Sequence, residues 1–167
     1  MNPMAQMTDP LAALTSFQAA LDDGKIFLQP ADIDPNVFVH LDQPNGVTRF
    51  TYARLDRHTV VALAMLVQVP SLDGLPCFQL GYAVPERYRA QGRATSIVIA
   101  AIAELERGLI RHGVQAFYIE SVVGRDNEPS ICVASATVLT SPVSITDEFS
   151  GLPALHYVRK VEKDSAR

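Results

Sequence analysis

Apolar residues recur along the chain at two spacings, which predicts a mixture of helices and strands. Repeats of three or four residues predict a helix from Pro10 that Gly24 stops, a second that ends before Gly113, and a third from Asn127 to about Leu139. Alternating or continuously apolar segments predict seven strands. These lie on either side of a turn at 44–46, and at 59–69, 77–84, 115–123, 141–149 and 152–161.

This order of elements predicts an α/β or α+β fold, in which helices cover the faces of a mixed sheet. The segment 59–69 is almost wholly apolar, as expected of a central strand that is covered on both faces. No internal repeat or linker divides the sequence. We therefore expect a single domain over 10–163, between tails at 1–9 and 164–167.

Composition excludes some classes of partner. The chain has 167 residues and a net charge of -4, so no overall positive charge draws it to DNA or to an anionic membrane. It shows neither a signal peptide nor a run of the ~20 apolar residues that span a bilayer, so we expect a cytoplasmic protein. Cys77 and Cys132 lie among apolar residues, which favours two buried free thiols over a disulfide.

A basic segment, "VPERYRAQGRAT", stands directly before the second predicted helix. A loop that precedes a helix can hold an anion, because the first amides of the helix have no intrahelical partner and the helix dipole adds positive charge. Gly92 would let a phosphate approach the backbone, and Arg89 and Arg93 would add mobile positive charge. The alternative is a surface turn that happens to be basic. The segment matches neither a P-loop nor a dinucleotide fingerprint.

The stretch "GYAVPERYRAQGRAT" resembles the signature of the GNAT acyl-CoA transferases, Arg/Gln-x-x-Gly-x-Gly/Ala, which reads here as residues 89–94. It is most similar to the ribosomal-protein and N-terminal acetyltransferase-like branches. The stretch "VGRDNEPSICVAS" follows at the spacing of the family's fourth helix, so the likeness covers about 77–139. The resemblance implies a mostly antiparallel sheet of about seven strands, splayed between the fourth and fifth, with helices on both faces.

The resemblance also implies acetyl-CoA as co-substrate, with its pyrophosphate on the amides of 91–95 and its pantetheine arm in the splay. A primary amine, on a small molecule or a protein, would attack the thioester directly, without a covalent enzyme intermediate. The acidic chain hints at a cationic acceptor, and the family includes monomers and homodimers. The implied coenzyme-binding residues are Tyr82, Ala83, Val84, Arg89, Ala90, Gln91, Gly92, Arg93, Ala94, Thr95, Asn127 and Ser130.

The sequence departs from the family pattern at its catalytic acid. Ala134 stands where many members carry a tyrosine, and Val138-Leu139 replaces the usual Gly-Phe. Glu120 is the candidate base, its alternative being a solvated strand carboxylate.

Tyr82 is the candidate acid, with Tyr88 a further one, although each could serve only in packing. Cys132 has no histidine near it in sequence, which argues against a nucleophile, and the four histidines show no metal-binding spacing.

Three functions therefore remain open from the sequence. The first is an acyl-CoA-dependent N-acyltransferase. The second is a coenzyme A-binding regulatory or interaction module that has lost turnover, for which Ala134 is the reason. The third is a GNAT-like fold that acts as a structural partner without coenzyme A.

Overall fold

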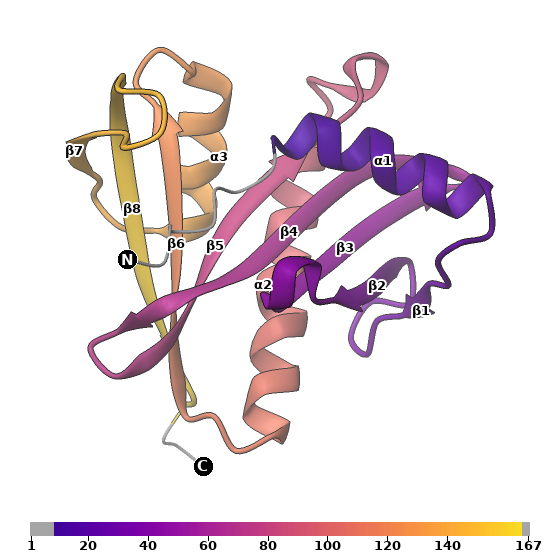
Figure 1. The fold of residues 1–167 in the computed structure, drawn as a ribbon, viewed down its shortest axis with the longest axis horizontal. Coiled ribbons are helices and arrows are strands. Elements are labelled where there is room, and N and C mark those ends of the chain that lie inside the picture. The colour runs from indigo at the N-terminus through magenta and orange to yellow at the C-terminus, as the bar shows by residue number, and fades with distance from the viewer. Residues whose placement is uncertain (1–8, 165–167) are drawn as a thin grey trace.

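Eight strands form one sheet in the structure, a computed structural model that describes residues 9–164 (Figure 1). The spatial order is β1-β2-β3-β4-β5-β6-β8-β7, and every neighbouring pair is antiparallel except β5 and β6. The strands are β1 (Gln29–Pro30), β2 (Val37–Asp42), β3 (Arg49–Asp56), β4 (Thr59–Leu72), β5 (Leu75–Ala83), β6 (Ala116–Gly124), β7 (Val143–Thr146) and β8 (Pro153–Glu162).

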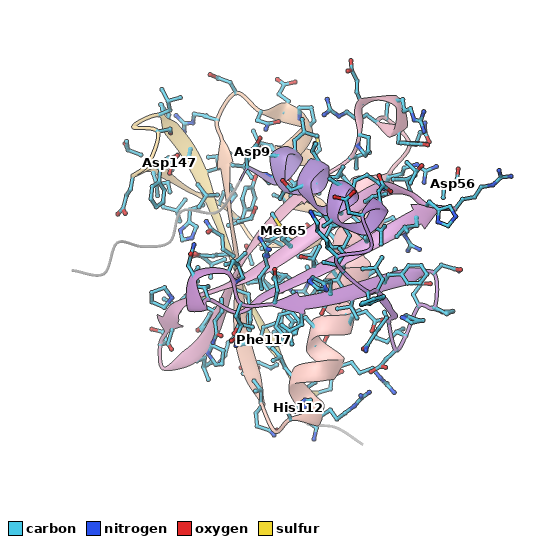
Figure 2. The ribbon with its side chains drawn as sticks, turned by 45° about the vertical axis from the view of Figure 1, so that its right-hand side comes forward. Asp9, Asp56, Met65, His112, Phe117 and Asp147 are labelled. Atoms are coloured by element: carbon cyan, nitrogen blue, oxygen red, sulfur yellow. The ribbon has the colours of Figure 1, made fainter. Side chains whose placement is uncertain are left out.

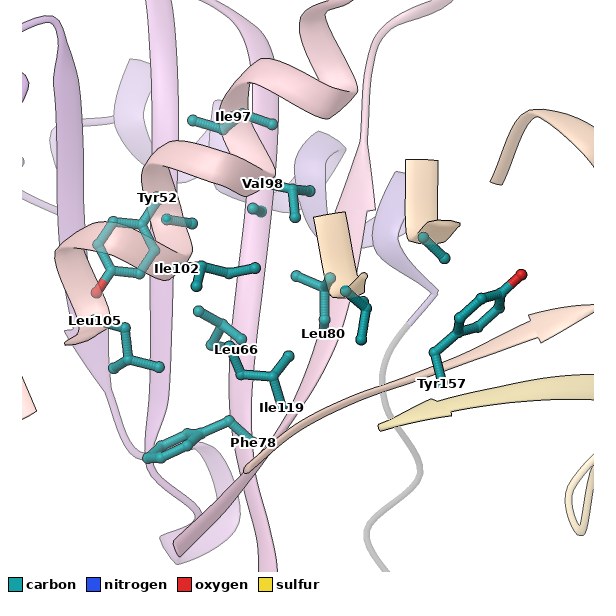
Figure 3. Packing of buried hydrophobic residues seen from close by; sticks show 14 of the residues in the cluster. Tyr52, Leu66, Phe78, Leu80, Ile97, Val98, Ile102, Leu105, Ile119 and Tyr157 are labelled. Carbon is teal, nitrogen blue, oxygen red and sulfur yellow. The ribbon is translucent and has the colours of Figure 1, made fainter. Parts of the chain in front are cut away.

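Helices cover both faces of this sheet, as the sequence predicted. Helix α1 (Pro10–Asp22) packs on one face, where Leu14 belongs to the same buried cluster as Leu63 and Met65 of β4. Helices α2 (Arg93–Arg111) and α3 (Glu128–Val138) pack on the other face. Figure 3 shows this second core, in which side chains of α2 meet those of the central strands.

Residues 60–66 of β4 are buried without a break, which confirms a central strand covered on both faces. Their alternate side chains supply the two cores in turn, since Leu66 packs with the α2 side and Met65 with the α1 side. Such a strand reads as a continuous apolar run rather than an alternating one.

Two details of the sheet differ from the prediction. The eighth strand, β1, has only two residues, which is too short to produce a periodic pattern. The loop predicted around Pro70 and Pro76 is instead a two-residue turn at Asp73 and Gly74, both with positive φ (49° and 75°). Strand β4 continues through Pro70 because its pairing with β5 is irregular between Val69 and Leu72, and an irregular position tolerates proline.

The cysteine prediction is right for Cys77 and wrong for Cys132, which is exposed. Helix α3 turns Ala134, Thr137 and Val138 inward, so the residue two places before Ala134 falls on the opposite side. Apart from Asp9 and Asp164, the predicted tails lie outside the described residues. Within those residues no helix is both long enough and apolar enough to span a bilayer.

The sheet opens between β5 and β6, where the sequence predicted a splay. These strands pair only over three positions, Cys77–Gln79 with Tyr118–Glu120. Beyond them β5 stays paired with β4 as far as Ala83, while β6 stays paired with β8 as far as Gly124. The two strand ends therefore diverge, and the loop to α2 begins at the open end.

Candidate functional site

A cavity of about 680 Å³ lies at the open end of the splay, against the loop between β5 and α2. Its wall also includes the first residues of α1 and of α3. Every residue that the sequence assigned to coenzyme A lines this cavity, with the exception of Gln91. The side chain of Gln91 instead accepts a hydrogen bond from Nε of Arg93, at 3.1 Å.

The loop before α2 has an unusual backbone. Ala90 and Gly92 both adopt left-handed conformations, with φ of 59° and 72°. For alanine this conformation costs about 1 kcal/mol, so the surrounding structure must hold it in place. Helix α2 starts immediately after Gly92, whose carbonyl accepts the N–H of Ser96. The amides at the start of this helix therefore face the cavity end of the loop without intrahelical partners.

Gly92 is required for its φ rather than for space, because no atom lies within 4 Å of the position that a Cβ would occupy there. A ligand could therefore approach this backbone closely. The N-terminal end of α2 combines that access with the positive end of the helix dipole, which is the chemistry of a phosphate site.

Two arginines of this loop make contacts with its other residues. Nε of Arg89 donates to the carbonyl oxygen of Val84 at 2.9 Å, which ties the loop back to the end of β5. The guanidinium of Arg93 lies 5.3 Å from the centre of the Tyr88 ring. Tyr88, expected as a further acid, thus lies among arginines, since its hydroxyl also accepts a hydrogen bond from Arg87.

A second cavity of about 280 Å³ adjoins the first and lies between the diverging ends of β5 and β6. The two cavities share Pro10, Tyr82, Asn127 and Ser130 in their walls. The lining of the smaller one includes Asp147 and Phe149, from the connection between β7 and β8. Figure 2 shows Asp9 and Asp147 at the same end of the molecule, although they are far apart in sequence.

Asp147 brings a fixed negative charge to the smaller cavity. Its carboxylate accepts a hydrogen bond from the hydroxyl of Ser150 at 2.7 Å and a further one from the Ser150 amide. The hydroxyl bond is the main reason why the pKa of Asp147 lies below its usual value. Phe149 beside it is half exposed and offers an aromatic surface.

Tyr82 bridges the two cavities. Its hydroxyl donates to the carbonyl oxygen of Ser130 at 2.9 Å, which connects β5 to α3 across the splay. Burial raises the pKa of this phenol, and the bond to Ser130 offsets only part of that effect. Asn127 caps α3 as predicted, because its side-chain oxygen accepts the Ser130 amide at 3.3 Å.

Glu120 lies at the last paired position before the splay, opposite Gln79 on β5 and Val158 on β8. Its Oε2 lies 2.9 Å from Nε2 of His156 on β8. Neither side chain is among those lining the two cavities in the described part of the chain, but Gln79 and Val122 beside them are. The structure thus places Glu120 at the edge of the site, paired with a histidine.

The position of the family's tyrosine carries no polar group. Ala134 is fully buried, at 0% exposure, in the core beneath α3. Tyr157 is also buried there (Figure 3). Its hydroxyl lies 3.2 Å from that of Ser135. Over residues 9–164 no three ligand-type side chains are grouped so that they could hold a metal ion.

Sequence reasoning missed the parts of the site that arrive from distant segments. Pro10, Asp147 and Phe149 carry no local motif, and only the fold brings them to the cavities. The partnership of His156 with Glu120 likewise depends on the register between β6 and β8. His156 gave no distinct local signal, because the same strand also carries Arg159 and Lys160.

Comparison with known proteins gives a match by structure only. No protein-family model and no curated protein sequence matches the chain. A GNAT-family acetyltransferase from Streptococcus pneumoniae matches with a TM-score of 0.53 and 10% identity, over 95% of this chain and 100% of that one. RimL, a ribosomal L7/L12 α-N-protein acetyltransferase in complex with coenzyme A, matches with a TM-score of 0.51 and 16% identity, over 70% and 64%.

RimJ of Mycobacterium smegmatis, in complex with CoA-disulfide, also has a TM-score of 0.51, with 18% identity over 71% of this chain and 56% of that one. The matched region thus spans less than two thirds of RimL and of RimJ. At these identities the likeness concerns the fold. The splayed mixed sheet, the order of the elements and these structural neighbours together show that the chain has the GNAT fold.

Proposed function

We propose that the protein is an acyl-CoA-dependent N-acyltransferase, which moves an acetyl group from acetyl-CoA to a primary amine by direct attack. The observation that carries this proposal is the pair of adjoining cavities at the splay. One offers a phosphate-type loop, and the other offers a carboxylate and an aromatic ring. Two reactants that meet there would be held close together, which is the main contribution an enzyme of this kind makes.

The loop supports coenzyme A as the donor. Its left-handed Ala90 and Gly92 leave the first amides of α2 accessible for a pyrophosphate. Two of the structural neighbours were solved with coenzyme A or its disulfide. Asp147 and Phe149 support a cationic acceptor, because a carboxylate and an aromatic face both attract an ammonium group.

A coenzyme A-binding module with little or no turnover is the second candidate. It is favoured by the absence of an evident acid among the described residues: Ala134 is buried, and the Tyr82 hydroxyl already donates its hydrogen bond to Ser130. The leaving thiolate would then have to take its proton from water or from the attacking nitrogen, unless the Tyr82 hydroxyl changes partner.

Two measurements separate the candidates. Titration calorimetry with acetyl-CoA tests binding, and absence of binding would leave only a structural role. Release of free coenzyme A over a panel of primary amines tests turnover. The product should be followed by chromatography, because the exposed Cys132 would react with a thiol reagent. Amine-dependent release supports the transferase, and binding without release supports the module.

A further inference from the structure

We infer that His156, oriented by Glu120, is the group that takes the proton from the acceptor amine. This inference rests on the proposed transferase function and assigns its base. It differs from the expectation at the sequence level, in which Glu120 itself was the base. The juxtaposition that carries it is the 2.9 Å contact between Glu120 Oε2 and His156 Nε2 beside the splay.

Strand register places His156 level with the open end of the splay, and Glu120 at the last position where β5 and β6 still pair. Cross-strand partners share a face of the sheet, and His156 lies opposite Val122, which lines the smaller cavity. Glu120 lies two positions further back on the same face, opposite Val158, where β5 and β6 are still paired with each other. The histidine is therefore level with the open part of the sheet, and the glutamate with its closed part.

The contact also fixes which nitrogen is available. A carboxylate only accepts hydrogen bonds, so Nε2 of His156 must carry the hydrogen that lies between them. The neutral imidazole then has Nδ1 as its free acceptor. A carboxylate that holds a histidine in one tautomer, and stabilises the cation that forms, is the arrangement of many acid–base sites.

A histidine also suits the task better than a carboxylate. An imidazole is the side chain that ordinarily exchanges a proton near neutral pH, whereas a carboxylate is ordinarily ionised there. A general base is most effective when its pKa lies close to the working pH. The side chains of His156 and Glu120 are 29% and 21% exposed, so both are shielded while water can still reach them. One water molecule could bridge the imidazole and an amine in the cavity.

Within residues 9–164 no other charged side chain forms a hydrogen bond or ion pair with His156 or Glu120. The thiol of Cys77 on β5 lies near Glu120, and burial raises its pKa to about 12, with the carboxylate adding to the shift, so it stays neutral. The partner of His156 on β7 is Val143, which carries no charge. The remaining ionisable groups nearby have partners of their own: Tyr118 with Asp73, Lys160 with Glu162, Arg125 with Ser144, and Asp147 with Ser150.

The step balances without any further reactant. The acceptor ammonium passes one proton to Nδ1 of His156, and the freed lone pair forms the C–N bond with the acetyl carbon. The C–S bond breaks, and its electron pair leaves on sulfur. A second proton from the nitrogen neutralises the thiolate, and the imidazolium returns its proton to water. The products are the amide, free coenzyme A and one proton.

The test compares His156→Gln, Glu120→Gln and the control His58→Gln, at an exposed turn between β3 and β4. We expect all three to bind acetyl-CoA within about twofold of the parent. With the best amine of the panel, His156→Gln should lower kcat on the order of 10²-fold at pH 7, the usual size of a general-base contribution. The loss should shrink as pH rises, because more amine is then free.

Glu120→Gln should lower kcat less, by about tenfold, and should change the imidazole tautomer of His156 as read from its nitrogen chemical shifts. The tautomer of His156 is measured in the parent and in Glu120→Gln, without an acceptor amine. This measurement separates loss of the orienting contact from general damage to the fold.

Three results would overturn the inference. The first is unchanged kcat in His156→Gln, and the second is a larger loss in Glu120→Gln than in His156→Gln. The third is coenzyme A binding without turnover of any amine, which would also favour the module. Failure of the parent to bind acetyl-CoA would instead refute the transferase itself, and the inference with it.

Discussion

A pair of substitutions at Gly92 tests the phosphate-binding loop most directly. Gly92 has φ of 72°, and asparagine and aspartate are the residues other than glycine that adopt this conformation most readily. No atom lies within 4 Å of an added Cβ, so neither side chain should clash. Gly92→Asn and Gly92→Asp should therefore carry the same backbone strain, of about 1 kcal/mol, and differ mainly in charge.

The magnitude follows from that charge. We take a separation of about 5 Å between a carboxylate at residue 92 and a phosphate held at the start of α2, for use in Coulomb's law. At an effective dielectric constant of about 20 this repulsion is about 3 kcal/mol for each phosphate charge. Salt at physiological strength weakens it by roughly half, which leaves about a tenfold loss of affinity. We expect Gly92→Asp to bind coenzyme A at least tenfold more weakly than Gly92→Asn.

Titration calorimetry at about 50 mM and 500 mM salt gives the result, with the urea midpoints of both variants as the control for folding. The difference between the variants should narrow at the higher salt concentration. Equal affinities for Gly92→Asp and Gly92→Asn at both concentrations would refute the reasoning, because no phosphate could then lie near this backbone.

Three further predictions concern charge, stability and reactivity. Arg89→Ala should weaken coenzyme A binding about tenfold at low salt and less at high salt. An equal loss at both salt concentrations would mean that Arg89 acts only by shaping the loop, through its hydrogen bond to Val84. The buried Glu104 carboxylate accepts three backbone N–H groups from the segment before β2, so Glu104→Gln should lose about 2–4 kcal/mol in urea unfolding. Glu106→Gln, on the same helix without such bonds, should stay within about 0.5 kcal/mol, and similar losses in both would contradict this account. A maleimide should label only Cys132 in the native protein, since Cys77 is buried with a pKa of about 12, and two native labels would show that the core opens.

The parts of the site that the sequence predicted belong to one continuous stretch. Residues 82–95 contain a strand end, a loop with Gly92 and a helix start, and each has its own local signal. Asn127 was recognisable for the same reason, as a cap directly before an apolar helix. Because these signals are local, the sequence was enough to predict where the strand ends and where the helix begins.

The other parts depend on register and could not be predicted in this way. His156 follows Glu120 by 36 residues, and they meet only because β6 and β8 pair in one particular alignment. Shifting that register by one residue would turn His156 to the opposite face of the sheet. Cys132 shows the same limit within a helix, since its apolar neighbours in sequence lie on another side of α3.

The splay itself connects stability with function. Beyond Gln79 and Glu120, β5 and β6 stop pairing with each other, so the facing backbone groups of both strands need other partners. The side chain of Tyr82 reaches from β5 to the carbonyl oxygen of Ser130 in α3. This bond does not replace the hydrogen bonds between the backbones of β5 and β6. An extended ligand that carries its own amides, as pantetheine does, would pair with these backbones. Such a ligand binds the native state alone, and at a hundredfold excess over its Kd it would add about 2.7 kcal/mol to the free energy of unfolding. If the proposed coenzyme A binding holds, the splay therefore couples ligand binding to the stability of the sheet, whichever amine is the acceptor.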